Sequence, residues 1–242
     1  MLAGRYEFKF PLGAADRAAV LACAREVMRP DPHGVAAVYR IASLYYDSPD
    51  RLAYREKLDG ELRRRKFRLR WYPDDSPTGF SAAFFEIKHR IDQRVSKERI
   101  RLEPEGALAL LSDPGELVRL AGHARPGADP GTLGNVLRQV ERQRLEPVTV
   151  ISYVREAWMG ALDERLRVTF DSEIQAHAPS AWTEASRGTG RALLPQERLL
   201  LEVKFDRRLE RWLRDAVVDR GLLQRRFSKY AAGVVALGLA PP

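Results

Sequence analysis

The sequence predicts an α+β fold, in which an antiparallel β-barrel surrounds an ionic lumen and helices pack against its apolar outer face. The first reason is the segment RKFRLRWY, residues 65–72, where a strand would place Lys66, Arg68 and Arg70 on one face and apolar side chains on the other. The second is that at least six segments alternate in this way. The third is that Glu-x-Lys and Arg-x-Arg spacings recur on them. A closed lumen explains such mixed charge better than an open sheet with a solvated ionic face.

In the first half of the chain we expect strands at residues 5–10, 39–46, 65–72, 82–90 and 95–102. We expect helices at residues 17–28, 51–58 and 106–120, the last with a break at Asp113-Pro114. Most of these strands show a period of two, and residues 39–46, YRIASLYY, also read as a strand that the turn residues DSPD close. The first helix is rich in Ala, Leu and Val and follows turn residues, with Asp16 as its expected N-cap. Asp59-Gly60 marks a tight turn, and PDDSPTG a hairpin tip.

In the second half we expect a helix at residues 133–142, strands at 147–156, 165–171 and 199–206, and helices at 208–220 and near the C-terminus. The polar residues 172–197 are expected to be mostly loop. The ionic faces of the alternating strands carry the residues of interest: Glu7, Lys9, Lys66, Arg68, Arg70, Glu86, Lys88, Lys97, Tyr153, Arg155, Arg165, Arg167, Glu202 and Lys204.

Composition limits the class of protein. The net charge of +8, from 41 Lys and Arg against 33 Asp and Glu, predicts a polyanionic partner. The single Cys23 excludes a disulfide within the chain and a Cys-based metal site. The four histidines are scattered without metal-ligand spacing, and GxSxG, GxGxxG and Walker motifs are absent. There is no long apolar segment and no signal-peptide pattern, so we expect one soluble, cytoplasmic domain over residues 1–242.

A lumen lined by cations repels itself unless an anion lies within it, and a polyphosphate would be held strongly there because the surroundings are partly dehydrated. The carboxylates among the cations predict a divalent metal. Glu202, with Glu7 or Glu86, could hold Mg²⁺ or Mn²⁺ that bridges phosphate oxygens.

Eight short motifs carry a resemblance to a known family. In order they are RYEFKF, YRIASLYYDSPD, KLDG to KFRLRWY, FEIKHR, YVRE, RLRVTFD, LLEVKFD and FSKY. This series, over about residues 5–235, resembles the VTC (vacuolar transporter chaperone) polyphosphate polymerase domain of the triphosphate tunnel metalloenzyme, or CYTH-like, superfamily. The resemblance implies an eight-stranded antiparallel tunnel. It also implies an enzyme that transfers the γ-phosphate of ATP to inorganic polyphosphate, with Mn²⁺ or Mg²⁺ as cofactor.

The resemblance and the strand faces together assign roles. For catalysis we expect the cations Arg68, Arg70, Lys88, Arg155, Arg167 and Lys204. For substrate binding we expect Lys9, Lys66, Lys97, Tyr153, Arg165, Ser228 and Lys229. For metal binding we expect Glu202, Glu7 and Glu86.

Two alternatives remain open. A triphosphatase of the same fold, including one that acts on RNA 5′-triphosphate ends, would use the same cations. Tunnel hydrolases carry ExExK on the first strand, whereas RYEFKF has one Glu before Lys9, and this favours the polymerase. A non-catalytic polyanion binder would not need Glu202 among the cations. We expect no nucleic-acid partner, since the patterned cations lie on strands. Fungal members carry an SPX domain and membrane helices, neither of which is expected in this chain. The sequence leaves the oligomeric state open.

Overall fold

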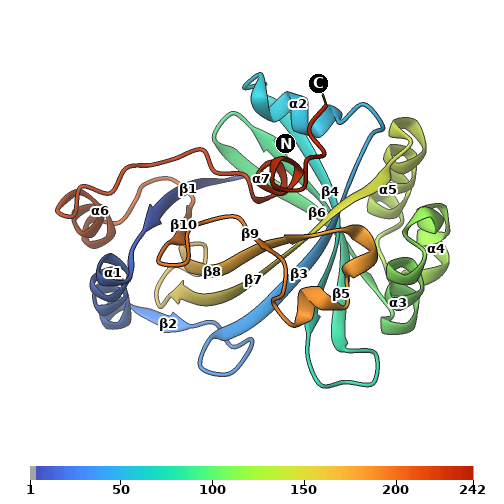
Figure 1. The fold of residues 1–242 in the computed structure, drawn as a ribbon. Coiled ribbons are helices and arrows are strands. Elements are labelled where there is room, and N and C mark those ends of the chain that lie inside the picture. Colours follow the sequence, from blue (N-terminus) through green and yellow to red (C-terminus); the bar gives the residue numbers. More distant parts are fainter. Residues whose placement is uncertain (1–3, 242) are drawn as a thin grey trace.

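The computed structural model describes residues 4–241, and its strands form one antiparallel sheet that closes into a ring of eight (Figure 1). The ring runs β7, β3, β4, β5, β6, β1, β10 and β8, and β8 pairs again with β7. Its strands are β1 (Arg5–Leu12), β3 (Val38–Asp47), β4 (Arg63–Pro73), β5 (Phe80–Ile91), β6 (Arg94–Leu102), β7 (Glu146–Gly160), β8 (Arg167–His177) and β10 (Leu199–Phe205). The short strands β2 (Met28–Pro30) and β9 (Arg191–Ala192) pair with β7 and β8.

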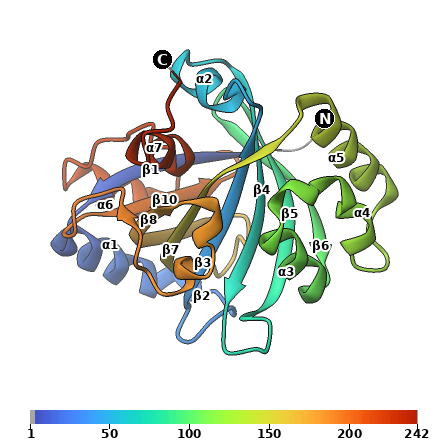
Figure 2. The same cartoon turned by 45° about the vertical axis from the view of Figure 1, so that its right-hand side comes forward.

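The helices lie outside this ring, as the sequence predicts. They are α1 (Ala14–Val27), α2 (Leu52–Leu58), α3 (Pro104–Ser112), α4 (Leu120–His123), α5 (Pro130–Gln143), α6 (Arg211–Val218) and α7 (Lys229–Ala236), with 3₁₀ turns at Pro114–Arg119, Pro179–Ala181 and Glu184–Ser186. Helices α3, α4 and α5 cover the outer side of β5 and β6 (Figure 2), α1 lies beside α6, and α2 lies beside α7 at one end of the ring. None of the helices in residues 4–241 is long and apolar enough to span a membrane.

The apolar strand faces pack against these helices in two main clusters. Trp71 and Phe85 on one side of the ring contact α3 and α5, and Phe10 and Val203 on the other side contact α1 and α6. Burial of each such side chain contributes about 1.5–3 kcal/mol. In these two clusters the strands turn their apolar faces outward, toward the helices, and their ionic faces inward. A third cluster, which includes Ile151 from the inner face of β7, packs against α7 at one end of the ring.

The ring is unevenly paired. Strand β1 makes seven register pairs with β10 but only two with β6, at Arg5↔Val95 and Tyr6↔Arg94. The side chains of Lys97 and Arg99 on β6 are 48% and 38% exposed, beyond the short pairing between β6 and β1.

The structure differs from the prediction at three places. Residues 172–177 continue β8 rather than forming a loop, because Ile174 and Ala176 are buried between the polar residues and the segment pairs with β7. Strand β8 begins at Arg167, so Arg165 precedes the strand instead of sharing its inner face. Helix α1 begins at Ala14 behind Gly13, three residues before the expected start.

Candidate functional site

A cavity of about 890 Å³, part of it open to solvent, occupies the inside of the ring. Twelve lysines and arginines line it, against two glutamates. Among residues 4–241 the lining consists of Glu7, Lys9, Tyr45, Lys57, Arg64, Lys66, Arg68, Arg70, Lys88, Arg90, Tyr153, Arg155, Glu202, Lys204, Arg226, Phe227, Ser228, Lys229 and Tyr230. The alternation of β1, β4, β5, β7 and β10 puts most of these side chains inside, because residues two apart share a strand face.

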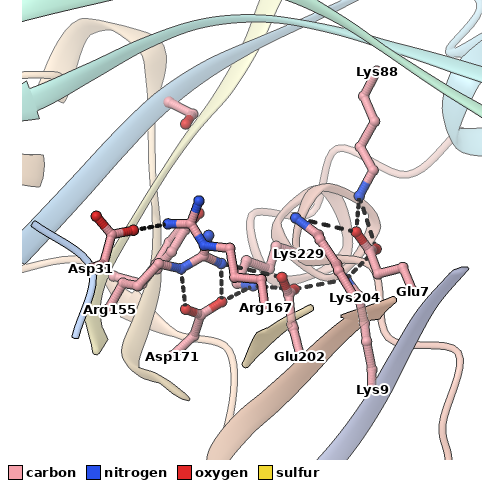
Figure 3. A network of polar contacts seen from close by, with 12 residues as sticks. Glu7, Lys9, Asp31, Lys88, Arg155, Arg167, Asp171, Glu202, Lys204 and Lys229 are labelled. Carbon is pink, nitrogen blue, oxygen red and sulfur yellow. Dashed lines mark hydrogen bonds and ion pairs between the residues drawn. The ribbon is translucent and has the colours of Figure 1, made fainter. Parts of the chain in front are cut away.

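Glu202 lies at the centre of one group of ion pairs (Figure 3). Its oxygens lie 2.9 Å from Lys9 Nζ, 2.8 Å from Lys229 Nζ and 3.1 Å from an Arg155 nitrogen. Asp171, which is fully buried, accepts two further bonds of 2.7 Å from Arg155 and one of 2.5 Å from Lys229. Burial alone would raise the pKa of Glu202, but Lys229, Lys9 and Arg155 hold it well below the usual value.

Glu7 forms a second group, next to the first. Both of its carboxylate oxygens accept a 2.8 Å bond from Lys88, and Lys9 and Lys204 lie 3.5 and 3.7 Å away. Burial opposes the charge of Glu7, yet Lys88, Lys9 and Lys204 keep its pKa well below the usual value. Lys9 contacts both Glu7 and Glu202 and so joins the two groups.

Glu86 is fully buried and does not line the cavity. One oxygen accepts bonds of 2.8 and 2.5 Å from Arg68, and the other accepts a bond of 2.9 Å from Arg99 and lies 3.5 Å from Lys97. The structure therefore places Lys97 at a half-exposed ion pair outside the cavity lining, whereas Arg68 lines the cavity.

Arg70 differs from its neighbours because neutral hydroxyls hold it. It donates to Ser43 Oγ at 3.2 Å and to Tyr153 Oη at 3.1 Å, and its nearest carboxylate, Glu86, is 3.9 Å away. A cation in this state keeps most of its charge available to an incoming anion.

Two further predicted site residues, besides Glu86 and Lys97, lie outside the cavity lining. Arg165 is exposed and pairs with Asp206 at 3.0 Å. Arg167 does not line the cavity, because it contacts Asp31 and donates to Tyr39 Oη at 2.9 Å. The β2–β3 connection that supplies Asp31 has no strand alternation that could have predicted this pairing.

The C-terminal FSKY motif closes one side of the cavity. Ser228 caps α7 by accepting from the Ala231 N–H at 3.2 Å, and it also accepts a 2.5 Å bond from Lys66. Tyr230 donates to the buried Asp47, which accepts from two N–H groups at the start of α2 as well. These bonds tie α7 to α2 and so position Lys229.

Four lining cations were not among the predicted site residues: Lys57, Arg64, Arg90 and Arg226. Arg64 and Arg90 continue the period of two beyond Lys66 and Lys88, a signal that the sequence already held. Lys57 lies on α2 and Arg226 in the segment before α7, where no local pattern marks them.

Among residues 4–241 there is no group of three or more His, Cys, Asp or Glu side chains placed to hold a metal ion by themselves. Glu7 and Glu202 are the two carboxylates on the cavity lining. Magnesium in phosphoryl-transfer sites is commonly held by one or two carboxylates together with substrate phosphates. Two lining carboxylates fit that donor set.

Comparisons with known proteins agree with this architecture. A comparison with curated proteins finds no match. Among solved structures, the chain resembles a Hippeastrum protein described as a putative adenylyl cyclase with a dominant triphosphatase activity (TM-score 0.57, 14% identity, 98% of each chain covered). At this identity the likeness shows the fold alone. A Pyrococcus horikoshii protein has a TM-score of 0.45 at 14% identity, covering 97% of this chain and 98% of its own.

The family comparison matches residues 4–238 to the VTC domain. This match spans nearly all of the chain and confirms the family that the eight motifs resemble. The chain belongs to the VTC domain family.

Proposed function

We propose that this protein is a metal-dependent polyphosphate polymerase that transfers the γ-phosphate of ATP to the end of a polyphosphate chain and releases ADP. The observation that carries the proposal is the cavity lining, with twelve cations and two carboxylates on the inner faces of the ring. Its positive charge exceeds its negative charge, and polyphosphate is the linear polyanion that such an enclosed surface fits.

Phosphoryl transfer needs positioning and charge neutralisation rather than a covalent nucleophile. The bond from the β–γ bridging oxygen to the γ-phosphorus breaks, and the terminal oxygen of the polyphosphate forms the new bond to that phosphorus. Arg70, held by Ser43 and Tyr153, and Lys88 face the cavity and would hold the phosphate oxygens as charge shifts between them. Removing one such donor should reduce the rate by about 10²-fold or more.

The carboxylates support metal dependence. A triphosphate in the cavity gives Lys9, Lys229 and Arg155 another anion to contact, which frees oxygens of Glu202 that these cations now occupy. Glu202 and Glu7 would then hold Mn²⁺ or Mg²⁺ together with phosphate oxygens. The bound ion would neutralise charge on those oxygens and polarise the transferred phosphoryl group.

The test is incubation of the purified protein with γ-labelled ATP and Mn²⁺ or Mg²⁺, with products resolved on a gel and ADP measured in parallel. We expect a metal-dependent ladder of polyphosphate that is lost in Glu202→Ala and Arg70→Ala. Arg65→Ala is the matched control, because Arg65 lies on the same strand but is exposed and bonds to Gln139.

Other outcomes contradict the proposal in distinct ways. Free phosphate without a ladder, above all from tripolyphosphate, identifies a triphosphatase. Neither product, together with tight polyphosphate binding, identifies a non-catalytic binder.

A further inference from the structure

One mouth of the cavity carries cations that face each other across two strands. In the register of β4 and β5, Arg64 is directly opposite Arg90, and Lys66 is directly opposite Lys88. Like charges in directly opposite positions destabilise an antiparallel pair. Two such cation pairs follow one another on the cavity side of the sheet. Because they do not stabilise the sheet, we infer that they serve to bind an anion.

These cations also differ from those deeper in the cavity. Lys88 pairs with Glu7, and Lys9 and Arg155 pair with Glu202. In contrast, none of Lys57, Arg64, Arg90 and Arg226 forms an ion pair with a carboxylate in the described part of the chain; Arg90 bonds to the carbonyl oxygen of Asp92 instead. Of the eight other lining cations, all but Lys66 lie within 4.0 Å of a carboxylate, whereas the four at the mouth have no such partner among the described residues.

Neighbouring mouth cations lower the pKa values of Lys57 and Arg64, which supports this contrast between the mouth and the deeper cavity. Burial and the neighbouring Arg64, Arg226 and Arg90 lower the pKa of Lys57. Burial, Arg90 and Arg226 lower the pKa of Arg64, although Glu56 and Glu61 act in the opposite direction. The four cations are close enough to repel one another, so an anion placed among them would relieve several repulsions together.

The arrangement is linear. Arg70, Arg68, Lys66 and Arg64 follow one another along the inner face of β4 at intervals of about 7 Å, from the centre of the cavity to its mouth. Lys57 on α2 and Arg226 before α7 extend this row outside the ring, where α2 and α7 lie side by side (Figure 1). A row of cations that leads out of a site suits a linear polyanion longer than the site itself.

We propose that this mouth, formed by Lys57, Arg64, Arg90 and Arg226, is a subsite for the phosphates of a polyphosphate chain beyond the three held inside the ring. The proposal rests on the polyphosphate chemistry proposed above and adds to it a direction for the chain and a preference for long chains. The chain passes out between α2 and the segment before α7. A triphosphate alone does not reach this subsite, so the subsite selects for long chains.

The test compares binding of tripolyphosphate and of long-chain polyphosphate by calorimetry without metal, at two salt concentrations. The variant is the double substitution Lys57→Gln and Arg226→Gln, since both side chains lie at the solvent side of the mouth. The control is Arg211→Gln with Arg214→Gln on α6, which removes the same charge beside α1, away from α2 and α7 (Figure 1).

We expect the mouth variant to bind long-chain polyphosphate at least about tenfold more weakly, with a shallower salt dependence because fewer phosphates are neutralised. Its affinity for tripolyphosphate should change by less than about twofold, and the control should bind both ligands about as the wild type does. The subsite proposal is overturned if the mouth variant loses equal affinity for both ligands. It is also overturned if the mouth variant binds both ligands as the control does. A wild-type protein that binds neither ligand overturns the proposed function itself.

Discussion

Replacement of Glu202 by Gln tests whether the cations of the cavity depend on the carboxylates for their stability. The substitution keeps the shape of the side chain and removes its charge. Lys9, Lys229 and Arg155 then lose a shared partner that lies 2.8 to 3.1 Å away, and only Asp171 and Glu7 remain to balance them. Lys229 and Arg155 are buried and the Lys9 side chain is only 12% exposed, so solvent replaces little of the lost charge.

The magnitude follows from the geometry. Breaking a buried ion pair by removing one partner destabilises a protein by about 3–5 kcal/mol, and the remaining carboxylates favour the lower value, about 3 kcal/mol. For a protein of this size that loss corresponds to a decrease in Tm of roughly 6–12 °C. A polyphosphate that enters the cavity supplies the missing negative charge. Tripolyphosphate should therefore raise the Tm of Glu202→Gln more than that of the wild type.

The assay is urea unfolding and thermal unfolding, both followed by circular dichroism, with and without tripolyphosphate. Glu164→Gln is the control, because Glu164 is 73% exposed and its ion pair with Arg29 should contribute less than about 1 kcal/mol. If Glu202→Gln is no less stable than Glu164→Gln in the absence of ligand, the cations do not depend on this carboxylate, and the electrostatic account of the cavity is wrong.

Three further predictions use the same cavity. Cations hold the pKa values of Glu7, Glu86 and Glu202 below normal despite burial. These carboxylates should therefore stabilise the fold fully above about pH 4.3, the usual Glu pKa, and the stabilisation should be lost as the pH falls through their lower pKa values in the folded protein. A Tm that does not change from neutral to acid pH contradicts this. Burial, Lys88 and Lys9 lower the pKa of Lys66, so phosphate binding at alkaline pH should be accompanied by proton uptake. Calorimetry in buffers of different ionisation enthalpy measures this uptake, which should be smaller in Lys66→Met. Equal binding heats in all buffers refute the prediction. Ser228→Ala should lower the free energy of unfolding by about 1 kcal/mol, because α7 loses its N-cap. The same variant should also bind tripolyphosphate more weakly, because Lys66 loses its hydrogen bond to Ser228. Asp129→Ala, which removes the N-cap of α5, should lower stability alone.

The inner face of the ring could be predicted because alternation with a period of two is a local property of the sequence. Lys66, Arg68 and Arg70 follow from the letters of one segment, and the structure places all three on the cavity lining. The same rule applied to residues 165–171 was wrong for Arg165, because the strand begins two residues later. Alternating polar and apolar residues indicate the two faces of a strand only where the backbone is extended.

Partners from distant segments could not be predicted in this way. Arg167 has the same spacing as the lining cations, but Asp31 from the connection after β2 binds it. Lys57 lies at the cavity mouth because α2 packs beside α7, an arrangement set by Asp47 and Tyr230. Single-strand patterns carry no information about such pairings, which depend on the register between elements far apart in the chain.

The closing of the ring by its first and last strands has a consequence for folding. Strand β1 pairs along its length with β10, which is synthesised almost a whole chain later, and only briefly with β6. Until β10 emerges from the ribosome, β1 and β8 lack the neighbour that lies between them, and such edges can pair with other chains. Contacts so distant in sequence also form slowly. A chain cut before Leu199 should therefore aggregate, and chaperone demand during synthesis should persist until the last fifth of the protein has been made.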